Sequence, residues 1–331
     1  MIRRSVADEA VDVDGPTDAE AVMGRWARGI VVVAIVTIAS GLVAGTAGAR
    51  PLPVVYSLGA ATATAVRSPD SPPPGADDWS CRPSTRHPVP VVLAHGTLFN
   101  RTIDWQALAP LLKNQGYCVY ALNYGQQPSS TYLGFPGAST TGGTGPIEQS
   151  ARQLAAFVDR VKSSTGAAKV DIVGHSQGGT MPRHYLKFLD GARSVDQLIG
   201  LSPSNHGTTV LGLSSIPGVP EALRLGLGTA IRQQIVGSDF LRRLNAGGDM
   251  VPGVRYTVIE TRHDEVVTPY TAAFLTGPGV TNITLQDGCP QDYTDHLAIT
   301  YDRLALSHVL HALDPSYPVA PCVFSSSLSG V

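Results

Sequence analysis

Short apolar runs rich in β-branched residues recur along the chain from residue 89 onward and alternate with amphipathic stretches. An uninterrupted apolar run of about four to eight residues is typical of a strand that is buried on both faces. We expect strands at Val89–Ala94, Tyr117–Leu122, Lys169–Val173, Leu198–Leu201, Val254–Glu260 and Asn282–Gln286. Because helical patterns separate these runs, the chain predicts an α/β fold with a mostly parallel sheet and helices on both faces.

The clearest helical pattern follows Pro146, where apolar residues recur at intervals of three or four and therefore share one helix face. These residues are Ile147, Ala151, Leu154, Val158 and Val161. Further helices are expected at Trp105–Lys113, Met181–Leu189 and Leu304–Leu313.

The segment before residue 50 has the features of a targeting signal. Arg25 and Arg28 precede an uncharged stretch, residues 29–49, which ends in the small residues Ala47-Gly48-Ala49 that signal peptidase favours. We therefore predict that residues 1–49 are a signal peptide with a long leader and that the protein is secreted. The alternative is an uncleaved membrane anchor, because residues 29–49 reach the length of about 20 residues that spans a bilayer.

Residues 50–80 lack regular apolar periodicity and contain the proline-rich run Ser68–Gly75. This composition predicts a linker, so the folded domain is expected to span residues 81–331. Beyond the leader, acidic and basic residues are equal in number, and the whole chain has a formal net charge of −2. A balanced charge without basic runs argues against nucleic-acid binding and suits uncharged substrates.

All four cysteines lie beyond this linker, and export would place them in an oxidising compartment, where an even number favours disulfides. Three pairings are open to four cysteines. Cys81 and Cys118 flank neighbouring expected strands, while Cys289 and Cys322 lie in the last part of the chain. We therefore expect the bridges Cys81–Cys118 and Cys289–Cys322.

A glycine-rich turn follows the third expected strand and precedes a helix. Its sequence, Gly174-His175-Ser176-Gln177-Gly178, matches the G-x-S-x-G pattern of a nucleophile elbow. Glycines two positions before and after the serine let the chain turn sharply without clashes at Cβ. Ser176 is therefore the expected nucleophile.

A serine hydroxyl needs a base to remove its proton and a carboxylate to orient that base. In this architecture the acid and the histidine follow the serine in that order, each in a loop after a strand. Asp264 lies just beyond the fifth expected strand and is the expected acid, with Glu265 as its nearest rival. His296 lies in a loop after the last expected strand and is the expected base, whereas His308 and His311 fall in the terminal helix.

Acyl transfer also needs hydrogen-bond donors for the oxyanion that forms at the substrate carbonyl. One expected donor is the backbone amide of Gln177, directly after the nucleophile. The other is expected in the loop after the first strand, where Thr97 has both an amide and a hydroxyl to donate.

With these residues in view, the sequence resembles the α/β-hydrolase superfamily, and more narrowly the secreted actinobacterial lipases and esterases grouped as class 2 lipases. The resemblance extends from Asp78 to about Cys322. It rests on Asp78–Cys81, Ala94–Thr97, Ala121–Gly125, Val170–Gly179, Ser204–Thr208, Val266–Tyr270 and Asp295-His296. It implies catalysis by Ser176, Asp264 and His296, with oxyanion donors at Thr97 and Gln177, through an acyl-serine intermediate and without a cofactor.

The resemblance also implies a small cap or lid insertion after the sixth strand, which we expect at residues 207–245. Many members carry an extra cysteine pair there, and residues 211–234 have none. The insertion interleaves apolar residues with glycines, which fits a lid over an acyl site and an ordinary capping subdomain equally well.

The sequence therefore predicts a secreted serine carboxylic-ester hydrolase that acts on acylglycerols or related esters, in solution or at a lipid–water interface. No metal is expected, because His95, His175, His184 and His206 lack metal-ligand spacing and are interpreted as structural or site-lining. Neither a nucleic-acid partner nor an obligate protein partner is implied. One alternative is a cell-envelope acyltransferase that uses the same triad. The least favoured is a noncatalytic hydrolase-like binding module.

Overall fold

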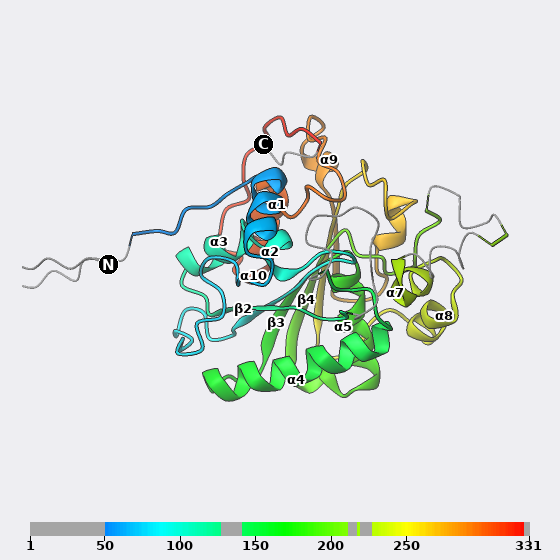
Figure 1. Ribbon diagram of the computed structural model, residues 1–331, viewed down its shortest axis with the longest axis horizontal. Coiled ribbons are helices and arrows are strands. Elements are labelled where there is room, and N and C mark those ends of the chain that lie inside the picture. Colours follow the sequence, from blue (N-terminus) through cyan, green and yellow to red (C-terminus); the bar gives the residue numbers. More distant parts are fainter. Residues whose placement is uncertain (1–49, 127–140, 211–216, 219–226, 328–331) are drawn as a thin grey trace, which may run out of the picture. The chain divides into compact units, whose positions relative to one another are not determined.

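A parallel sheet forms the centre of the computed structural model, which describes residues 50–126, 141–210, 217–218 and 227–327 (Figure 1). Within these residues the strands are β1 (Val91–Ala94), β2 (Val119–Leu122), β3 (Val170–His175), β4 (Val195–Leu201), β5 (Arg255–Glu260) and β6 (Val280–Thr284). Their order is β2-β1-β3-β4-β5-β6, and each neighbouring pair is parallel. The order therefore reverses between β1 and β3, and ligand sites of open α/β sheets form at the carboxyl ends of such strands.

Two hydrophobic clusters, one on each face of the sheet, complete a three-layer arrangement (Figure 1). On one face, the buried stripe of α4 (Ile147–Thr165) packs with α5 (Gln177–Phe188) and α8 (Asp239–Asn245). On the other, α1 (Leu58–Arg67), α3 (Leu108–Asn114) and α10 (Arg303–Leu313) supply the buried side chains. Both faces of the sheet are covered, as the continuous apolar strands predicted.

Several element boundaries differ from the expectation, and β4 and α5 both begin earlier than expected, at Val195 and Gln177. The helix expected at Trp105–Lys113 begins later, at Leu108 (α3). A separate short helix, α2 (Arg101–Asp104), precedes it and is capped by the Asn100 side chain, which accepts a hydrogen bond from the Ile103 amide. The last strand ends at Thr284 instead of continuing to Gln286, because the chain then turns into α9 (Leu285–Gly288). The remaining elements are η2 (Gly191–Arg193), α7 (Thr229–Gln233) and η4 (Tyr270–Ala273).

The linker expected at residues 50–80 is corrected by the structure, since Arg50–Val331 forms one compact unit that includes this segment. Residues 58–67 form helix α1, whose Ala61 is buried in the core. The Thr102 hydroxyl donates hydrogen bonds to the carbonyls of Pro69 and Ser71, at 3.0 and 2.6 Å. Tertiary packing and hydrogen bonds therefore fix a segment whose composition alone suggested flexibility.

The cap insertion was expected after the sixth strand, but residues 207–245 follow β4, the fourth strand among the described residues. Residues 211–216 and 219–226 of this insertion lie outside the described residues. The described part contains α7 and α8, which lie beside each other at one end of the sheet (Figure 1).

Both disulfides join the cysteines that were expected to pair. Cys81 bonds to Cys118 beside β2, and Cys289 bonds to Cys322 near the C-terminus. Three residues beyond Cys322, the Ser325 carbonyl accepts a hydrogen bond from the Tyr293 amide at 2.9 Å. The C-terminal segment is thereby tied to the loop that contains His296.

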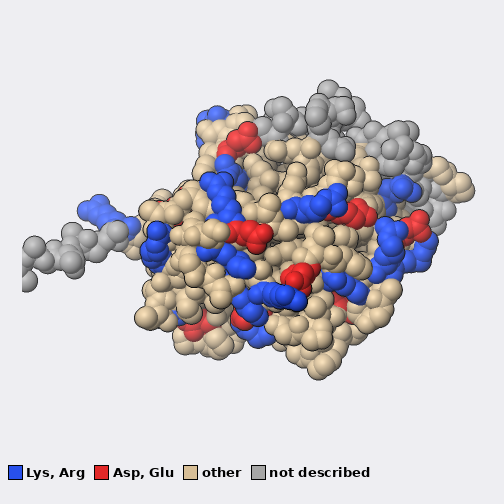
Figure 2. All heavy atoms as spheres, turned by 90° about the horizontal axis from the view of Figure 1, so that it is seen from below, with Lys and Arg blue, Asp and Glu red and all other residues tan. Residues whose placement is uncertain are grey.

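Charged side chains of both signs are interspersed on the face of the molecule that carries α4 (Figure 2). Within the described residues, no helix is both long and apolar enough to cross a membrane. Residues 1–49, where the signal peptide is expected, lie outside the described residues.

Candidate active site

Ser176 lies at a sharp turn between β3 and α5, with φ of 53° and ψ of −123°. A non-glycine residue with positive φ is strained, and such strain is typical of a nucleophile held by its surroundings. The turn is so tight that a Cβ on Gly174 would lie 1.9 Å from the Gly178 carbonyl oxygen. A Cβ on Gly178 would lie 2.0 Å from the Ala94 carbonyl oxygen. A side chain at either position would clash with the backbone, so the turn requires glycine at both.

His296 and Asp264 meet at the carboxyl end of the sheet. The Nδ1 of His296 lies 2.7 Å from the Asp264 carboxylate, and both side chains are buried. Asp264 also accepts hydrogen bonds from the amides of Val266 and Val267, at 2.8 and 2.6 Å. The carboxylate is thereby fixed, and Nδ1 of the imidazole carries the hydrogen that it donates.

The rival acids make other contacts. Glu265 accepts a hydrogen bond from the backbone amide of His296 at 3.3 Å and does not contact its ring. Glu260, the last residue of β5, accepts from the Ser202 hydroxyl at 2.9 Å and from the Thr261 amide at 2.8 Å. Asp264 is thus the carboxylate that the geometry pairs with the imidazole.

The electrostatics separate these acids further. Burial raises the pKa of Glu260 well above its usual value, and the charge of Asp264 adds to the effect. Burial also opposes ionisation of Asp264, but the charge and hydrogen bond of His296 outweigh it and lower the pKa of Asp264. Burial would lower the pKa of His296, yet Asp264 raises it overall. These shifts favour the ionised form of Asp264 and the protonated form of Glu260.

Ser176 and His296 line one cavity of about 330 Å³ at the carboxyl ends of the strands. Within the described residues, the Ser176 hydroxyl and His296 form no hydrogen bond. Such catalytic hydrogen bonds often tighten only when substrate binds. The remaining wall is mostly apolar, from Leu98, Phe99, Val210, Leu227, Ile231, Val266, Val267 and Leu297. A buried apolar wall beside a nucleophile suits an acyl chain.

Thr97 also lines this cavity, on the side of the loop after β1. Its hydroxyl oxygen accepts a hydrogen bond from the Gln234 amide at 2.9 Å, which leaves the hydroxyl hydrogen available for a second partner. Gln177 begins α5, so its backbone amide is one of the first helical amides, which have no partner within the helix. Its side chain points elsewhere and donates to the Gly143 carbonyl at 2.8 Å.

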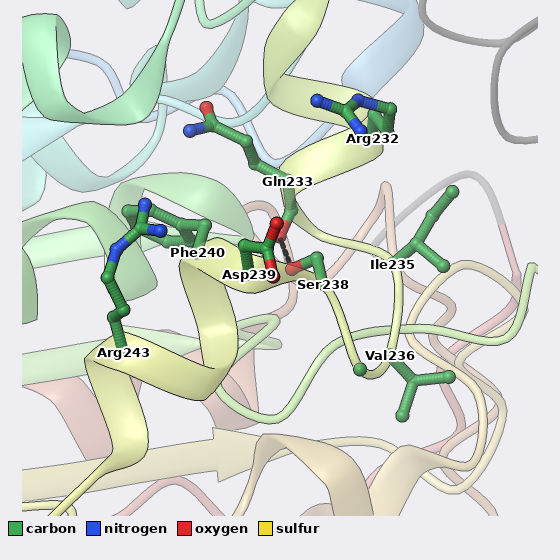
Figure 3. Close-up of a pocket in the computed structure, with 9 residues that line it drawn as sticks. Arg232, Gln233, Ile235, Val236, Ser238, Asp239, Phe240 and Arg243 are labelled. Atoms are coloured by element: carbon green, nitrogen blue, oxygen red, sulfur yellow. Dashed lines mark hydrogen bonds between the residues drawn. The ribbon is translucent and has the colours of Figure 1, made fainter.

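A cavity of about 450 Å³ between α7 and α8 exceeds the one at Ser176 in volume but has different chemistry (Figure 3). Arg232 and Arg243 line it, and the Ser238 hydroxyl there donates to the Gln233 carbonyl at 2.6 Å. None of the expected catalytic residues contributes to it. Volume therefore does not locate the site, whereas the serine and the carboxylate–imidazole pair do.

The family model described as lipase (class 2) matches residues 88–304, which is most of the described domain. The chain belongs to the class 2 lipase family. This match includes β1, the serine turn, Asp264 and His296.

Curated relatives of this class 2 lipase match over shorter regions. The chain is 34% identical over 147 residues to a triacylglycerol lipase of Burkholderia plantarii, which is 43% of this chain and 35% of that protein. It is 34% identical over 106 residues to a triacylglycerol lipase of Pseudarthrobacter phenanthrenivorans, which is 30% of this chain and 28% of that protein. The chain thus spans about a third of the length of these relatives.

Solved structures share the fold of this lipase-family chain. Lipase B of Aspergillus fumigatus matches with a TM-score of 0.57 and 22% identity, over 78% of this chain and 58% of that structure. The mature form of Bacillus licheniformis lipase BlEst2 matches with a TM-score of 0.50 and 17% identity, over 74% and 96%. These likenesses show the α/β-hydrolase fold.

Two residues around the site of this class 2 lipase were not singled out from the sequence. Asp104, at the end of α2, contacts His175, and Gln234 contacts Thr97. Neither contact has a local signal, because the partners are far apart in the chain.

Of the other histidines, His311 contacts the Tyr317 carbonyl at the C-terminal end of α10. Within the described residues, no group of three or more histidine, cysteine or acidic side chains could hold a metal.

Proposed function

We propose that this class 2 lipase is a serine carboxylic-ester hydrolase that works through an acyl-serine intermediate. The observation that carries the proposal is the apolar cavity that contains both Ser176, on its strained turn, and His296, paired with Asp264. An apolar wall next to an activated hydroxyl favours esters with hydrocarbon acyl chains. The triacylglycerol lipases among the relatives support acylglycerols as substrates.

In the first half of the reaction, Ser176 Oγ attacks the ester carbonyl carbon while His296 Nε2 takes the hydroxyl proton. Asp264 stabilises the imidazolium that results, and the amides of Thr97 and Gln177 donate to the oxyanion. The tetrahedral intermediate then collapses, the bond to the alcohol breaks, and His296 returns the proton to the leaving alcohol. The acyl group remains on Ser176.

In the second half, water replaces the alcohol. His296 takes a proton from the water, whose oxygen attacks the acyl carbon, and the new oxyanion uses the same donors. Collapse releases the carboxylic acid as Ser176 regains its proton from His296. No step requires a redox partner, because all bonds are exchanged by nucleophilic substitution at the carbonyl carbon.

The decisive experiment is labelling of the full chain with a fluorophosphonate, combined with hydrolysis of p-nitrophenyl esters of increasing chain length. We expect labelling at Ser176 and ester hydrolysis, with both lost in Ser176→Ala. Ser150→Ala is the matched control, since Ser150 is a buried serine in α4 that donates to the Pro146 carbonyl. Unlabelled wild-type protein, or equal activity in Ser176→Ala, would overturn the proposal. The same assay with glycerol present separates the two reactions. Glycerol esters in place of free carboxylic acid would identify acyl transfer instead of hydrolysis.

We propose further that the protein is secreted. Two disulfides in the described domain suit an oxidising compartment, and residues 29–49 have the pattern of a signal peptide. N-terminal sequencing of the exported protein tests this, and cleavage after Ala49 is the expected result. An intact N-terminus in the membrane fraction would support the anchor instead.

A further inference from the structure

A second carboxylate–imidazole pair lies directly behind the nucleophile. His175, the residue before Ser176, has its Nδ1 3.1 Å from Oδ2 of Asp104. The His175 side chain is 2% exposed and that of Asp104 is fully buried. An isolated charge at this depth would be unstable, so the two groups must share their protons in a way that keeps the pair neutral overall.

The second ring nitrogen of His175 is occupied as well. Its Nε2 lies 2.9 Å from the backbone carbonyl oxygen of His296. A carbonyl oxygen only accepts, so Nε2 carries a hydrogen, and a further proton lies between Nδ1 and Asp104. Because neither nitrogen is free, His175 cannot take the proton of Ser176.

Asp104 makes a third connection, to the loop after β1. The amide of Gly96 donates to Oδ2 of Asp104 at 2.7 Å, and Gly96 directly precedes Thr97. There is no room for a larger residue here, since a Cβ on Gly96 would lie 2.9 Å from Nδ1 of His175 and 3.3 Å from Cβ of Ser176. The pair therefore contacts the oxyanion loop, the serine turn and the His296 loop at once.

We propose that Asp104 and His175 are positioning residues that hold these three loops in the geometry that ester hydrolysis requires. This inference rests on the proposed function. Each loop contributes one component to the reaction, namely an oxyanion donor, the nucleophile or the base. Misplacement of such groups by about 1 Å can slow an enzyme by roughly a hundredfold.

The pair also affects the charge around the base. The rings of His175 and His296 are 5.0 Å apart, and the charge of Asp104 is one of the causes that raise the pKa of His296. Other titratable groups that face this region are His95, Asp264 and Glu265. Changes to the pair therefore reach His296 through its surroundings as well as through the hydrogen bond to its carbonyl.

The test uses three variants of the full chain, His175→Gln, Asp104→Asn and the double variant, with rates normalised to the serines that a fluorophosphonate titrates. We expect kcat to fall by roughly 10- to 100-fold in each, with KM changed by less than about threefold. Because the rates refer to titrated serines, a fall in kcat at nearly unchanged KM reports misplaced reacting groups and not a smaller folded fraction. The double variant should lose little more than the larger single loss, because the two residues act as one unit.

The chain offers a matched control in His206. Its Nε2 lies 3.0 Å from Asp249 and its Nδ1 3.2 Å from the Ala272 carbonyl, so a carboxylate and a carbonyl again occupy the two ring nitrogens. His206 is 36% exposed, and none of these three residues lines the cavity of Ser176. His206→Gln should lower the melting temperature without lowering the kcat of the titrated serines. If His175→Gln and Asp104→Asn behave as His206→Gln does, the pair is merely structural and the inference is wrong. If the wild-type protein neither labels nor hydrolyses esters, the proposed function fails instead.

Discussion

Two buried carboxylate–imidazole pairs flank Ser176, and they differ in whether the imidazole keeps a ring nitrogen without a hydrogen-bond partner. In the Asp264–His296 pair, the Nδ1 nitrogen is bonded to the carboxylate at 2.7 Å and the ring borders the cavity. In the Asp104–His175 pair, a carboxylate occupies one nitrogen and a carbonyl the other. A carboxylate partner alone therefore does not identify a catalytic base. The proposed base is the imidazole that keeps one nitrogen available.

The two pairs also differ in their supports. His175 ends β3, an inner strand of the sheet, and is paired in register with Leu201 of β4. His296 lies in a loop that is held by the Cys289–Cys322 disulfide and by two hydrogen bonds to the His296 backbone. Glu265 accepts from the His296 amide, and His175 donates to the His296 carbonyl. The proposed catalytic pair is therefore held by contacts to a loop, and one of these contacts comes from the other pair.

The largest effect is expected from His296→Ala. Loss of the base should lower kcat by roughly 10⁴-fold or more, because no other imidazole in the site has a free nitrogen. Steady-state hydrolysis of a soluble ester measures this directly. A loss no greater than that in His175→Gln would remove the functional distinction between the two pairs.

Asp264→Asn should lower kcat by roughly 10³- to 10⁴-fold, since an amide in place of the carboxylate no longer stabilises the imidazolium. Glu265→Gln is the control, because Glu265 contacts only the backbone of His296, and less than about a tenfold loss is expected there. Comparable losses in the two variants would show that Glu265 shares the role of Asp264.

The disulfides test the difference in support. Replacing either cysteine pair by serine should lower the free energy of unfolding by about 3 to 4 kcal/mol, because the loops that the bridges close are similar in length, with separations of 37 and 33 residues. Only removal of Cys289–Cys322 should also lower kcat, by several-fold below the melting temperature. Equal kcat in the two double variants would mean that the His296 loop does not need its bridge.

The smallest effect concerns pH. Asp264 raises the pKa of His296 above its ordinary value of about 6.5, and the base works only when neutral. The rate constant kcat/KM should therefore be constant above this raised pKa and fall tenfold per unit below it. A pH profile on a neutral ester measures the limb, and a midpoint below about 6.5 would contradict the expected influence of Asp264.

Much of this site follows from local patterns in the sequence. The apolar runs located the six strands, and the G-x-S-x-G turn gave the position of Ser176 because that turn needs glycine where other side chains would clash. The order of strands and loops also predicted where an acid and a histidine should lie. Composition misled for residues 50–80, because the helix α1 is stabilised by packing on the core that no local pattern records.

The sequence by itself determined the fold, the serine turn and a short list of acids and histidines. The tertiary structure alone decided which members of that list touch one another. Asp104 and His175 are 71 residues apart in the chain, and His175 and His296 are 121 apart. Hydrogen bonds act over about 3 Å in space. Two partners that the sheet brings together can therefore be far apart in the sequence, and no local sequence pattern indicates their contact.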